Sequence, residues 1–144
     1  MKTLFIILLV VIVIILVTNT EDPLLTEIKR RYDYSLKKLP DDGQFDILKK
    51  NRAIITAKTD GEDIAFNVNK GYEIHICLDG KKINAAMYIL LHELAHITVE
   101  EYNHSERFWS NFKRLREIAH EIGVYVPERE MEYCGQTIKD SLAY

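Results

Sequence analysis

The sequence has little cysteine, little excess charge and no internal repeat. Its two cysteines, Cys77 and Cys134, lie far apart, so they do not imply a disulfide framework and fit a reducing environment as well as an oxidising one. The formal net charge of -3 gives no general attraction to nucleic acid. With 47% hydrophobic and 28% charged residues, the composition is that of a globular protein, and the length permits one compact domain.

The first twenty residues contain a long hydrophobic run, unbroken from Leu4 to Val17. A helix over residues 1–20 would be about 30 Å long, the thickness of a bilayer's hydrocarbon core. We therefore expect a transmembrane segment over residues 1–20 and a domain over residues 21–144. A cleaved secretory signal is the alternative, but no A-x-A-like site follows the run. Orientation stays open, because Lys2 favours a cytoplasmic N-terminus whereas later basic residues favour a cytoplasmic domain (Lys29, Arg30, Arg31, Lys37, Lys38).

The remaining sequence predicts an α+β fold. Asp22 and Pro23 suit a helix start, and apolar residues then recur at three- and four-residue steps until Pro40 (Leu25, Ile28, Tyr32, Leu36, Leu39). Three segments of strand character follow, at residues 53–59, 63–69 and 72–78, with Asp60-Gly61 as a hairpin turn signal between the first two. We therefore expect a short antiparallel sheet with one buried face.

Two further helices are expected after the sheet. Asn84 is the expected cap of a helix that runs to about Tyr102, where Asn103 can end it in a left-handed conformation. Ser105 can cap the next helix, and Gly123 stops it. The second helix has an apolar face at helical spacing (Phe108, Phe112, Leu115, Ala119, Ile122).

The first of these helices carries ionisable residues inside an apolar run. His92 and His96 would project from one helix face, close enough to share a metal ion, while Glu93 lies to the side. This H-E-x-x-H pattern is the signature of zinc peptidases, whose three protein ligands leave a fourth position for water. Glu93 would take a proton from the attacking water and pass it to the leaving amine. A hydrogen-bonded cluster of the same three residues in the core is the alternative.

The third ligand has two candidates. Seven residues separate His96 from His104, which follows the expected helix end, so the chain can fold back and bring its ring to the metal. Glu100 is the rival, since it lies one helical turn after His96 and offers an oxygen donor. We favour His104 and expect Glu101 to face solvent.

Several other residues have possible roles. His75 could hydrogen-bond an oxyanion or could simply be exposed on a strand, and His120 is expected to be solvated. Cys134 could bind the metal as an inhibitory fourth ligand or could only pack. Four tyrosines are equal candidates for stabilising an oxyanion (Tyr88, Tyr102, Tyr125, Tyr133).

The motifs L-H-E-L-A-H and N-H-S-E-R-F-W resemble those of a compact zincin group that includes the WLM-domain and SprT-like metallopeptidases. The resemblance covers about residues 45–138 and is closer to small WLM-like proteins of large DNA viruses, in which a tail such as Tyr133-Cys134-Gly135 recurs. It implies that Glu93 is the catalytic base and that three histidines bind one zinc ion (His92, His96, His104). It also implies a helix and small sheet packed on the metal helix, with an extended peptide paired to a sheet edge.

Together these features predict a membrane-tethered zinc peptidase that acts on a protein or peptide. Its cofactor would be one Zn2+ per chain, its location a single-pass segment in a host or virion membrane, and nucleic acid is not an expected partner. Two other functions fit the same residues: a WLM/SprT-like protease acting on DNA-associated proteins, and a non-catalytic zinc-containing membrane or virion protein. The first calls for a basic surface, which an acidic chain does not suggest, and the second does not require Glu93.

Overall fold

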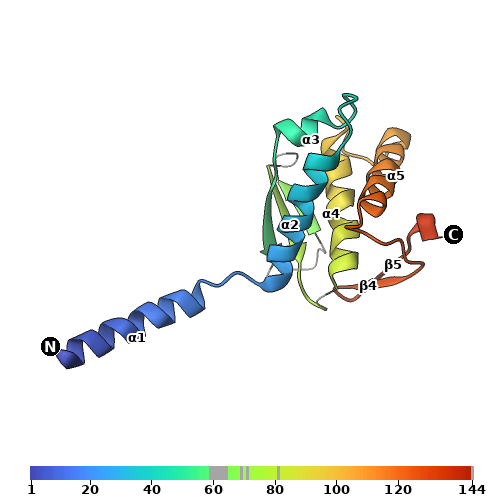
Figure 1. Ribbon diagram of the computed structural model, residues 1–144. Helices are drawn as coiled ribbons and strands as arrows, with labels where there is room; N and C mark the ends of the chain where they lie inside the picture. The colour runs from blue at the N-terminus through green and yellow to red at the C-terminus, as the bar shows by residue number, and fades with distance from the viewer. Residues whose placement is uncertain (59–64, 69, 71, 81, 144) are drawn as a thin grey trace.

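The computed structural model describes residues 1–58, 65–68, 70, 72–80 and 82–143. Its first helix, α1 (Lys2–Thr18), projects away from the rest of the chain, as Figure 1 shows, and all of its side chains are exposed. Among the described residues, no single helix is both long and apolar enough to cross a membrane. By length and composition, α1 passes that test only when joined to the next helix, with a bend of 56° between them.

The helix α2 (Pro23–Lys38) begins and ends where the sequence predicts. The side chain of Asp22 accepts a hydrogen bond from the backbone N–H of Leu24 at 2.8 Å, and Pro23 occupies the first turn. The predicted apolar face is buried (Leu25, Ile28, Tyr32, Leu36, Leu39). A short helix, α3 (Asp46–Lys50), follows and buries Leu48. The sequence pattern does not predict α3, which is only five residues long.

The prediction of an antiparallel sheet is wrong, because the sheet is mixed. The strands β1 (Ile54–Lys58), β2 (Ala65–Val68) and β3 (Glu73–Cys77) lie in the order β1-β3-β2, so β3 is central. β3 pairs parallel with β1 and antiparallel with β2. The predicted turn at Asp60-Gly61 lies outside the described residues. Alternating polarity predicts which face of a strand is buried, but it does not determine which neighbour the strand pairs with.

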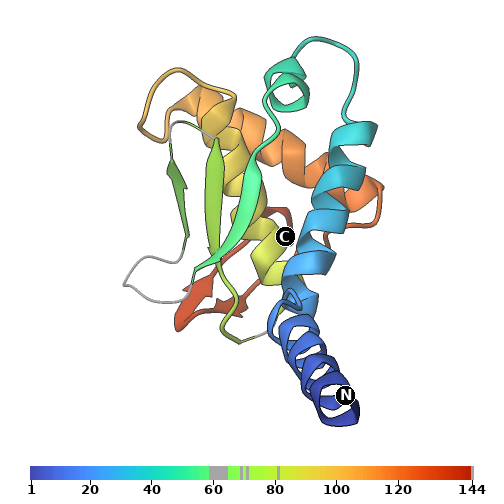
Figure 2. The ribbon, with the colours of Figure 1, turned by 90° about the vertical axis from the view of Figure 1, so that its left-hand side faces the viewer.

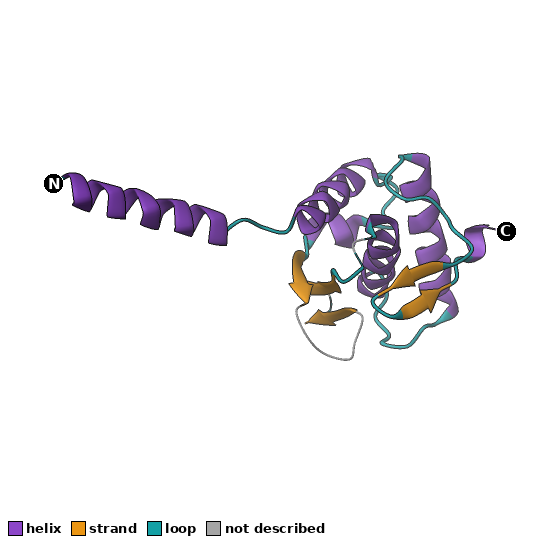
Figure 3. Ribbon diagram, turned by 90° about the horizontal axis from the view of Figure 1, so that it is seen from below, coloured by secondary structure: helices purple, strands orange, loops and turns teal. Residues whose placement is uncertain are grey.

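The sheet, α4 (Ile83–Ile97) and α5 (Glu106–Glu121) form successive layers, as Figure 3 shows from below. α2 and α4 pack on the same face of the sheet, where Ile55, Ile74 and Ile76 are buried. The opposite face is turned to the viewer in Figure 2. α4 therefore lies in the core, which explains why the sequence around the H-E-x-x-H pattern is so apolar.

Both predicted ends of α4 are wrong. Asn84 does not cap the helix, since its side-chain oxygen accepts from the N–H of Val126 at 2.9 Å and its amide donates to the Val126 carbonyl at 2.6 Å. The helix ends at Ile97 rather than near Tyr102, and at this end the Thr98 hydroxyl donates back to the Ala95 carbonyl at 2.6 Å and accepts from the Asn111 amide at 2.9 Å. The left-handed residue predicted at Asn103 is also wrong, as the described non-glycine residues with positive φ are Lys70 and Cys134.

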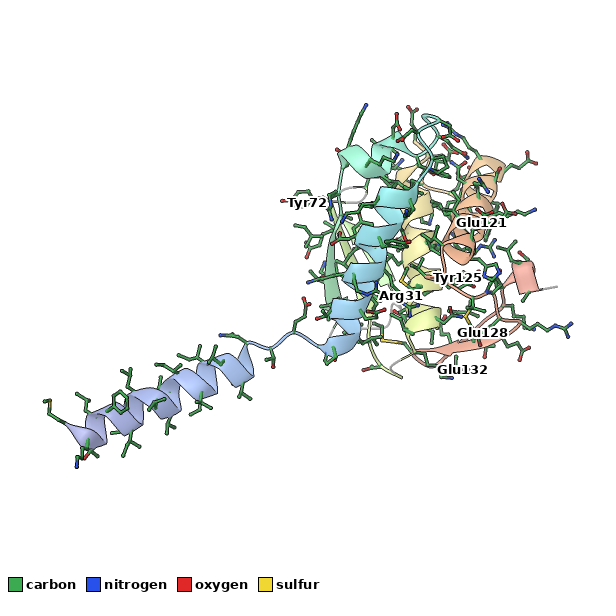
Figure 4. The ribbon with its side chains drawn as sticks, viewed as in Figure 1. Arg31, Tyr72, Glu121, Tyr125, Glu128 and Glu132 are labelled. Carbon is green, nitrogen blue, oxygen red and sulfur yellow. A yellow bond between two sulfur atoms is a disulfide. The ribbon has the colours of Figure 1, made fainter. Side chains whose placement is uncertain are left out.

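The end of α5 and the C-terminal segment fold back on the core. Gly123 follows α5 with φ +77°, as the sequence predicts. β4 (Met131–Tyr133) and β5 (Gln136–Ile138) form an antiparallel hairpin, and a short 3-10 helix, Ser141–Ala143, follows it. Figure 4 labels Tyr125 and Arg31, which lies on α2. The guanidinium of Arg31 donates to the Val124 carbonyl at 2.9 Å.

The two cysteines form a disulfide that their spacing did not predict. Cys77, at the end of β3, is bonded to Cys134, in the turn between β4 and β5. The Tyr133 hydroxyl adds a hydrogen bond of 2.6 Å to the Cys77 carbonyl. The hairpin is therefore tied covalently to the sheet.

Candidate metal centre

Three histidines meet on the side of α4 that faces α5. His92 and His96 lie one helical turn apart on α4, and His104 immediately precedes Ser105, the cap of α5. The Nε2 atoms of His92 and His96 are 3.3 Å apart, and those of His96 and His104 are 3.1 Å apart. The capping prediction for Ser105 is confirmed, since its hydroxyl accepts from the Phe108 N–H at 3.1 Å. This cap turns the chain so that His104 faces α4.

The distances fit a shared metal ion. Three nitrogens that each lie about 2.0–2.1 Å from a tetrahedral zinc ion are about 3.3 Å from one another. The three histidines are also the group that, among the described residues, could hold a metal ion, with all donor atoms within 4.8 Å of one another. Glu100, the rival ligand, is exposed and does not belong to this group. The structure thus brings together the three histidines that the sequence favours as ligands.

The electrostatics keep the ring nitrogens available. Burial, followed by the charges of His96, His104 and Arg116, lowers the pKa of His92 to about 4. Burial, followed by the charges of His104 and Lys70, also lowers the pKa of His96. A neutral imidazole keeps the lone pair that binds a metal, so the two helical histidines are ready to bind near neutral pH.

An aromatic layer supports the three imidazoles. The ring centroid of Phe108 lies 5.0 Å from His92, 4.4 Å from His96 and 4.6 Å from His104. Trp109 packs beside His104 with centroids 5.4 Å apart. Phe108, on the apolar face of α5, and the half-exposed Trp109 therefore restrict the orientation of the histidine rings.

Glu93 lies next to the histidines in sequence but outside their cluster. Glu93 is only 8% exposed, and burial raises the pKa of its carboxyl group to about 7. A carboxyl group of this kind can accept and return a proton near neutral pH, which is the property a general base requires.

The other candidates divide by position. Tyr125 donates its hydroxyl to Asp140, and Tyr133 donates its own to the Cys77 carbonyl, so both hydroxyls are engaged away from the histidines. Tyr102 is exposed, whereas Tyr88 is half-buried one turn before His92, with its ring 5.1 Å from Phe112. Tyr88 is therefore the tyrosine best placed in the same helical row as the ligands.

The remaining predictions concern His75, Cys134 and His120. His75 lies on the sheet face opposite α4, where its Nδ1 is 3.0 Å from the Thr56 hydroxyl and its Nε2 is 3.2 Å from Glu73. The prediction that Cys134 could bind the metal is wrong, because its sulfur is bonded to Cys77. His120 is exposed, as expected.

One buried polar network near the site was not predicted. The Asn111 amide donates to the Thr98 hydroxyl at 2.9 Å, and the Gln44 amide donates to the Asn111 carbonyl oxygen at 3.1 Å. The signal was present in the sequence, because Asn111 is a polar residue on the apolar face of α5, directly before Phe112. This network fixes the chain just after α4.

Comparison with known proteins places this chain in a family. The family model for the WLM domain matches residues 58–142. The chain belongs to the WLM-domain family. It is 35% identical over 109 residues to the uncharacterized protein R325 of Acanthamoeba polyphaga mimivirus, an alignment that covers 69% of this chain and 55% of R325. The predicted resemblance to WLM-like proteins of large DNA viruses is confirmed.

A second relative comes from another virus. The chain is 32% identical over 69 residues to the uncharacterized protein 136R of Invertebrate iridescent virus 6, across 42% of this chain and 38% of 136R. The WLM-domain chain thus spans about half the length of R325 and less of 136R. No solved structure gives a significant match.

Proposed function

We propose that this WLM-domain protein is a zinc-dependent peptidase. The observation that carries the proposal is the convergence of three Nε2 atoms, 3.1 and 3.3 Å apart along the cluster, beside a buried carboxyl group on the same helix. His92, His96 and His104 would hold the ion. When bound there, zinc lowers the pKa of water to about 7 and polarises a carbonyl group.

Glu93 is the proposed general base. Its carboxylate takes a proton from the attacking water and delivers it to the nitrogen of the leaving amine, so that one group serves both halves of the hydrolysis. The raised pKa of Glu93, about 7, supports this role because the same carboxyl group can hold the proton between the two steps.

The proposed substrate is an extended protein or peptide segment. β2 stands at one end of the strand order β1-β3-β2, and it packs against α4 together with β3. A peptide added beside β2 would gain main-chain hydrogen bonds along a strand that flanks the metal helix.

We also propose that α1 tethers residues 21–144 to a membrane. Every side chain of α1 is exposed, and fourteen consecutive apolar residues, Leu4 to Val17, make up most of its length. Transfer of such a surface from water into lipid is favourable by about 25 cal/mol per Å². A binding assay with lipid vesicles tests the tether separately from the chemistry.

The test of the proposed reaction uses the full chain in mild detergent with an unfolded, dye-labelled protein as substrate. The parent should contain zinc and cleave the substrate, whereas Glu93→Gln should keep its zinc and lose about 10²–10⁴-fold in rate. Glu100→Gln is the matched control, because this exposed carboxylate lies on the segment after α4 and should leave rate and zinc unchanged. Full activity in Glu93→Gln would contradict the proposal.

A further inference from the structure

The segment that leads from α4 to the third histidine lies outside both helices. α4 ends at Ile97 and α5 begins at Glu106, so the position of His104 depends on what holds residues 98–105. The first end is held by the buried hydrogen bond from Asn111 to Thr98. The other end is held by Ser105, whose hydroxyl donates to Glu101 and accepts from the Phe108 N–H.

The middle of this segment is held from the sheet by one side chain. Lys70, between β2 and β3, donates from its Nζ to the backbone carbonyls of Val99 and Glu100. Its Nζ also lies 4.9 Å from the ring centroid of Tyr102. A lysine ammonium offers three donors and a full charge, so it can serve two carbonyls and an aromatic face together.

The electrostatics explain why a cation suits this place. Val99 and Glu100 directly follow the C-terminal end of α4, where the last carbonyls of the helix leave negative partial charge, so a cation close to this end is favourable. Lys70 is among the charges that lower the pKa of His96, after burial and the charge of His104, and it also lowers the pKa of Glu101, for which the hydrogen bond from Ser105 is the largest cause. Glu101, in turn, also has its pKa lowered by the charge of Arg107 at the start of α5.

The backbone of Lys70 gives independent support. Its φ is +50°, in the left-handed region that lysine seldom adopts and that glycine or asparagine would fill with less strain. Tyr72 closes the turn with an N–H bond of 3.1 Å to the Val68 carbonyl. A lysine at such a position is best explained by a requirement for its side chain.

From these contacts we propose that Lys70 is a positioning residue that presents His104 to His92 and His96. This inference rests on the proposed metal site. Lys70 does not touch the reacting groups; it fixes the carbonyls of residues 99 and 100, and so the path of the chain from the second ligand to the third. Without the ammonium, the carbonyls of Val99 and Glu100 lose this donor. The chain between the buried Val99 and Ser105 is then held less firmly, and His104 samples positions away from the cluster.

The test compares zinc affinity in full-length variants, measured by competition with a chelator. Lys70→Met should weaken zinc binding by about 10–100-fold, the usual effect of losing an outer-shell partner, and Lys70→Arg should recover part of the affinity. Lys49→Met is the matched control, since Lys49 also donates to a backbone carbonyl, that of Pro40 at 3.3 Å, and pairs with Asp41 far from the histidines. It should bind zinc as the parent does.

A second readout separates positioning from a general loss of structure. Trp109 is the single tryptophan of the chain, and its ring lies 5.4 Å from His104, so its fluorescence should change when zinc draws His104 into place. In zinc-free Lys70→Met, the melting temperature should stay near that of zinc-free Lys49→Met, while the midpoint of the zinc-induced fluorescence change moves to higher zinc.

The outcomes distinguish the two proposals. A folded parent that binds no zinc overturns the metal site itself. A parent that binds zinc, together with Lys70→Met that binds it equally well, overturns the role of Lys70 and leaves the metal site standing. If zinc-free Lys70→Met is unfolded under conditions where Lys49→Met is folded, Lys70 is a structural clip and the positioning role is overturned as well.

Discussion

The two ends of α5 hold their polar groups in opposite ways. Toward its C-terminal end, Arg116 is 4% exposed and pairs with Asp140, which is fully buried and also accepts from the Tyr125 hydroxyl. The Leu142 N–H donates to the same carboxylate at 2.9 Å. Opposite charges and matched donors therefore satisfy one another within the protein.

At the N-terminal end of α5, groups of the same kind gather instead. Burial, followed by the charges of His96, His104 and Arg116, lowers the pKa of His92, and burial, followed by the charges of His104 and Lys70, lowers that of His96. Such a cluster resists protonation and presents three lone pairs to one point. The first network pairs its own charges within the fold, whereas the proposed metal centre would gain stability from a bound cation.

The largest expected effect comes from breaking the self-sufficient network. Asp140→Asn leaves the buried guanidinium of Arg116 without its opposite charge, and should lower the free energy of unfolding by about 3–5 kcal/mol. Urea denaturation measures the loss. Asp33→Asn is the control, because its pair with Arg52 is about half exposed and should contribute less than about 1 kcal/mol.

The zinc affinity of folded Asp140→Asn should stay within about threefold of the parent, because the pair bonds to Phe112, Tyr125 and Leu142 rather than to the histidines, and the charge of Arg116 is the smallest cause that lowers the pKa of His92. A folded variant that fails to bind zinc would show that the Arg116–Asp140 pair and the histidine cluster are coupled rather than independent.

The disulfide offers the next largest effect. It joins residues 57 apart in sequence, and replacing both Cys77 and Cys134 by serine should lower the free energy of unfolding by about 2–4 kcal/mol. The physical reason is that the open chain gains conformational freedom in the unfolded state. Melting temperatures of the double variant and the parent check this, and the zinc content at low temperature should be equal in the two.

A melting temperature unchanged by the double serine variant would mean that the bond does not constrain the unfolded chain. Loss of zinc from a folded double variant would instead mean that the hairpin of β4 and β5 helps to hold the metal site.

The smallest expected effect is the pH dependence of stability that Glu93 causes. In the zinc-free protein, folding raises the pKa of this carboxyl from 4.5 to about 7, so the folded state holds its proton more tightly than the unfolded state. The stability of the parent should therefore fall as pH rises from about 4.5 to 7, and Glu93→Gln should lack this fall. At pH 8 the zinc-free variant should be more stable by about 2–3 kcal/mol, and at pH 4 the two should be equal.

Denaturation at both pH values, in the presence of a chelator, measures this difference. Glu100→Gln serves as the control and should change stability by less than about 0.5 kcal/mol at either pH. Equal stability of the parent and Glu93→Gln at pH 8 would mean that burial does not disfavour the Glu93 carboxylate.

Much of the helical structure was predictable because its signals are local. Asp22 and Pro23 mark the start of α2, and Ser105 and Gly123 mark the two ends of α5, each through a hydrogen bond or backbone angle set within a few residues. His92 and His96 were also predictable as a pair, because helical spacing alone brings residues four apart onto one face.

The features that the sequence missed depend on contacts between distant residues. The parallel pairing of β1 with β3 leaves no mark on the alternation of either strand. The end of α4 depends on Thr98, which Asn111 holds from another helix, and the disulfide depends on the position of the C-terminal hairpin. Lys70 reaches carbonyls 29 and 30 residues away, so no short pattern could have revealed it.

The most direct test of the central claim is the amount of zinc bound per chain, measured by elemental mass spectrometry on the full-length parent and on His104→Ala. We predict about one zinc in the parent. His104→Ala should lose more affinity than the 10–100-fold typical of outer-shell changes. His75→Ala, on the opposite face of the sheet, should bind zinc as the parent does. A folded parent without zinc, or a His104→Ala variant that binds zinc as tightly as the parent, would contradict the central claim.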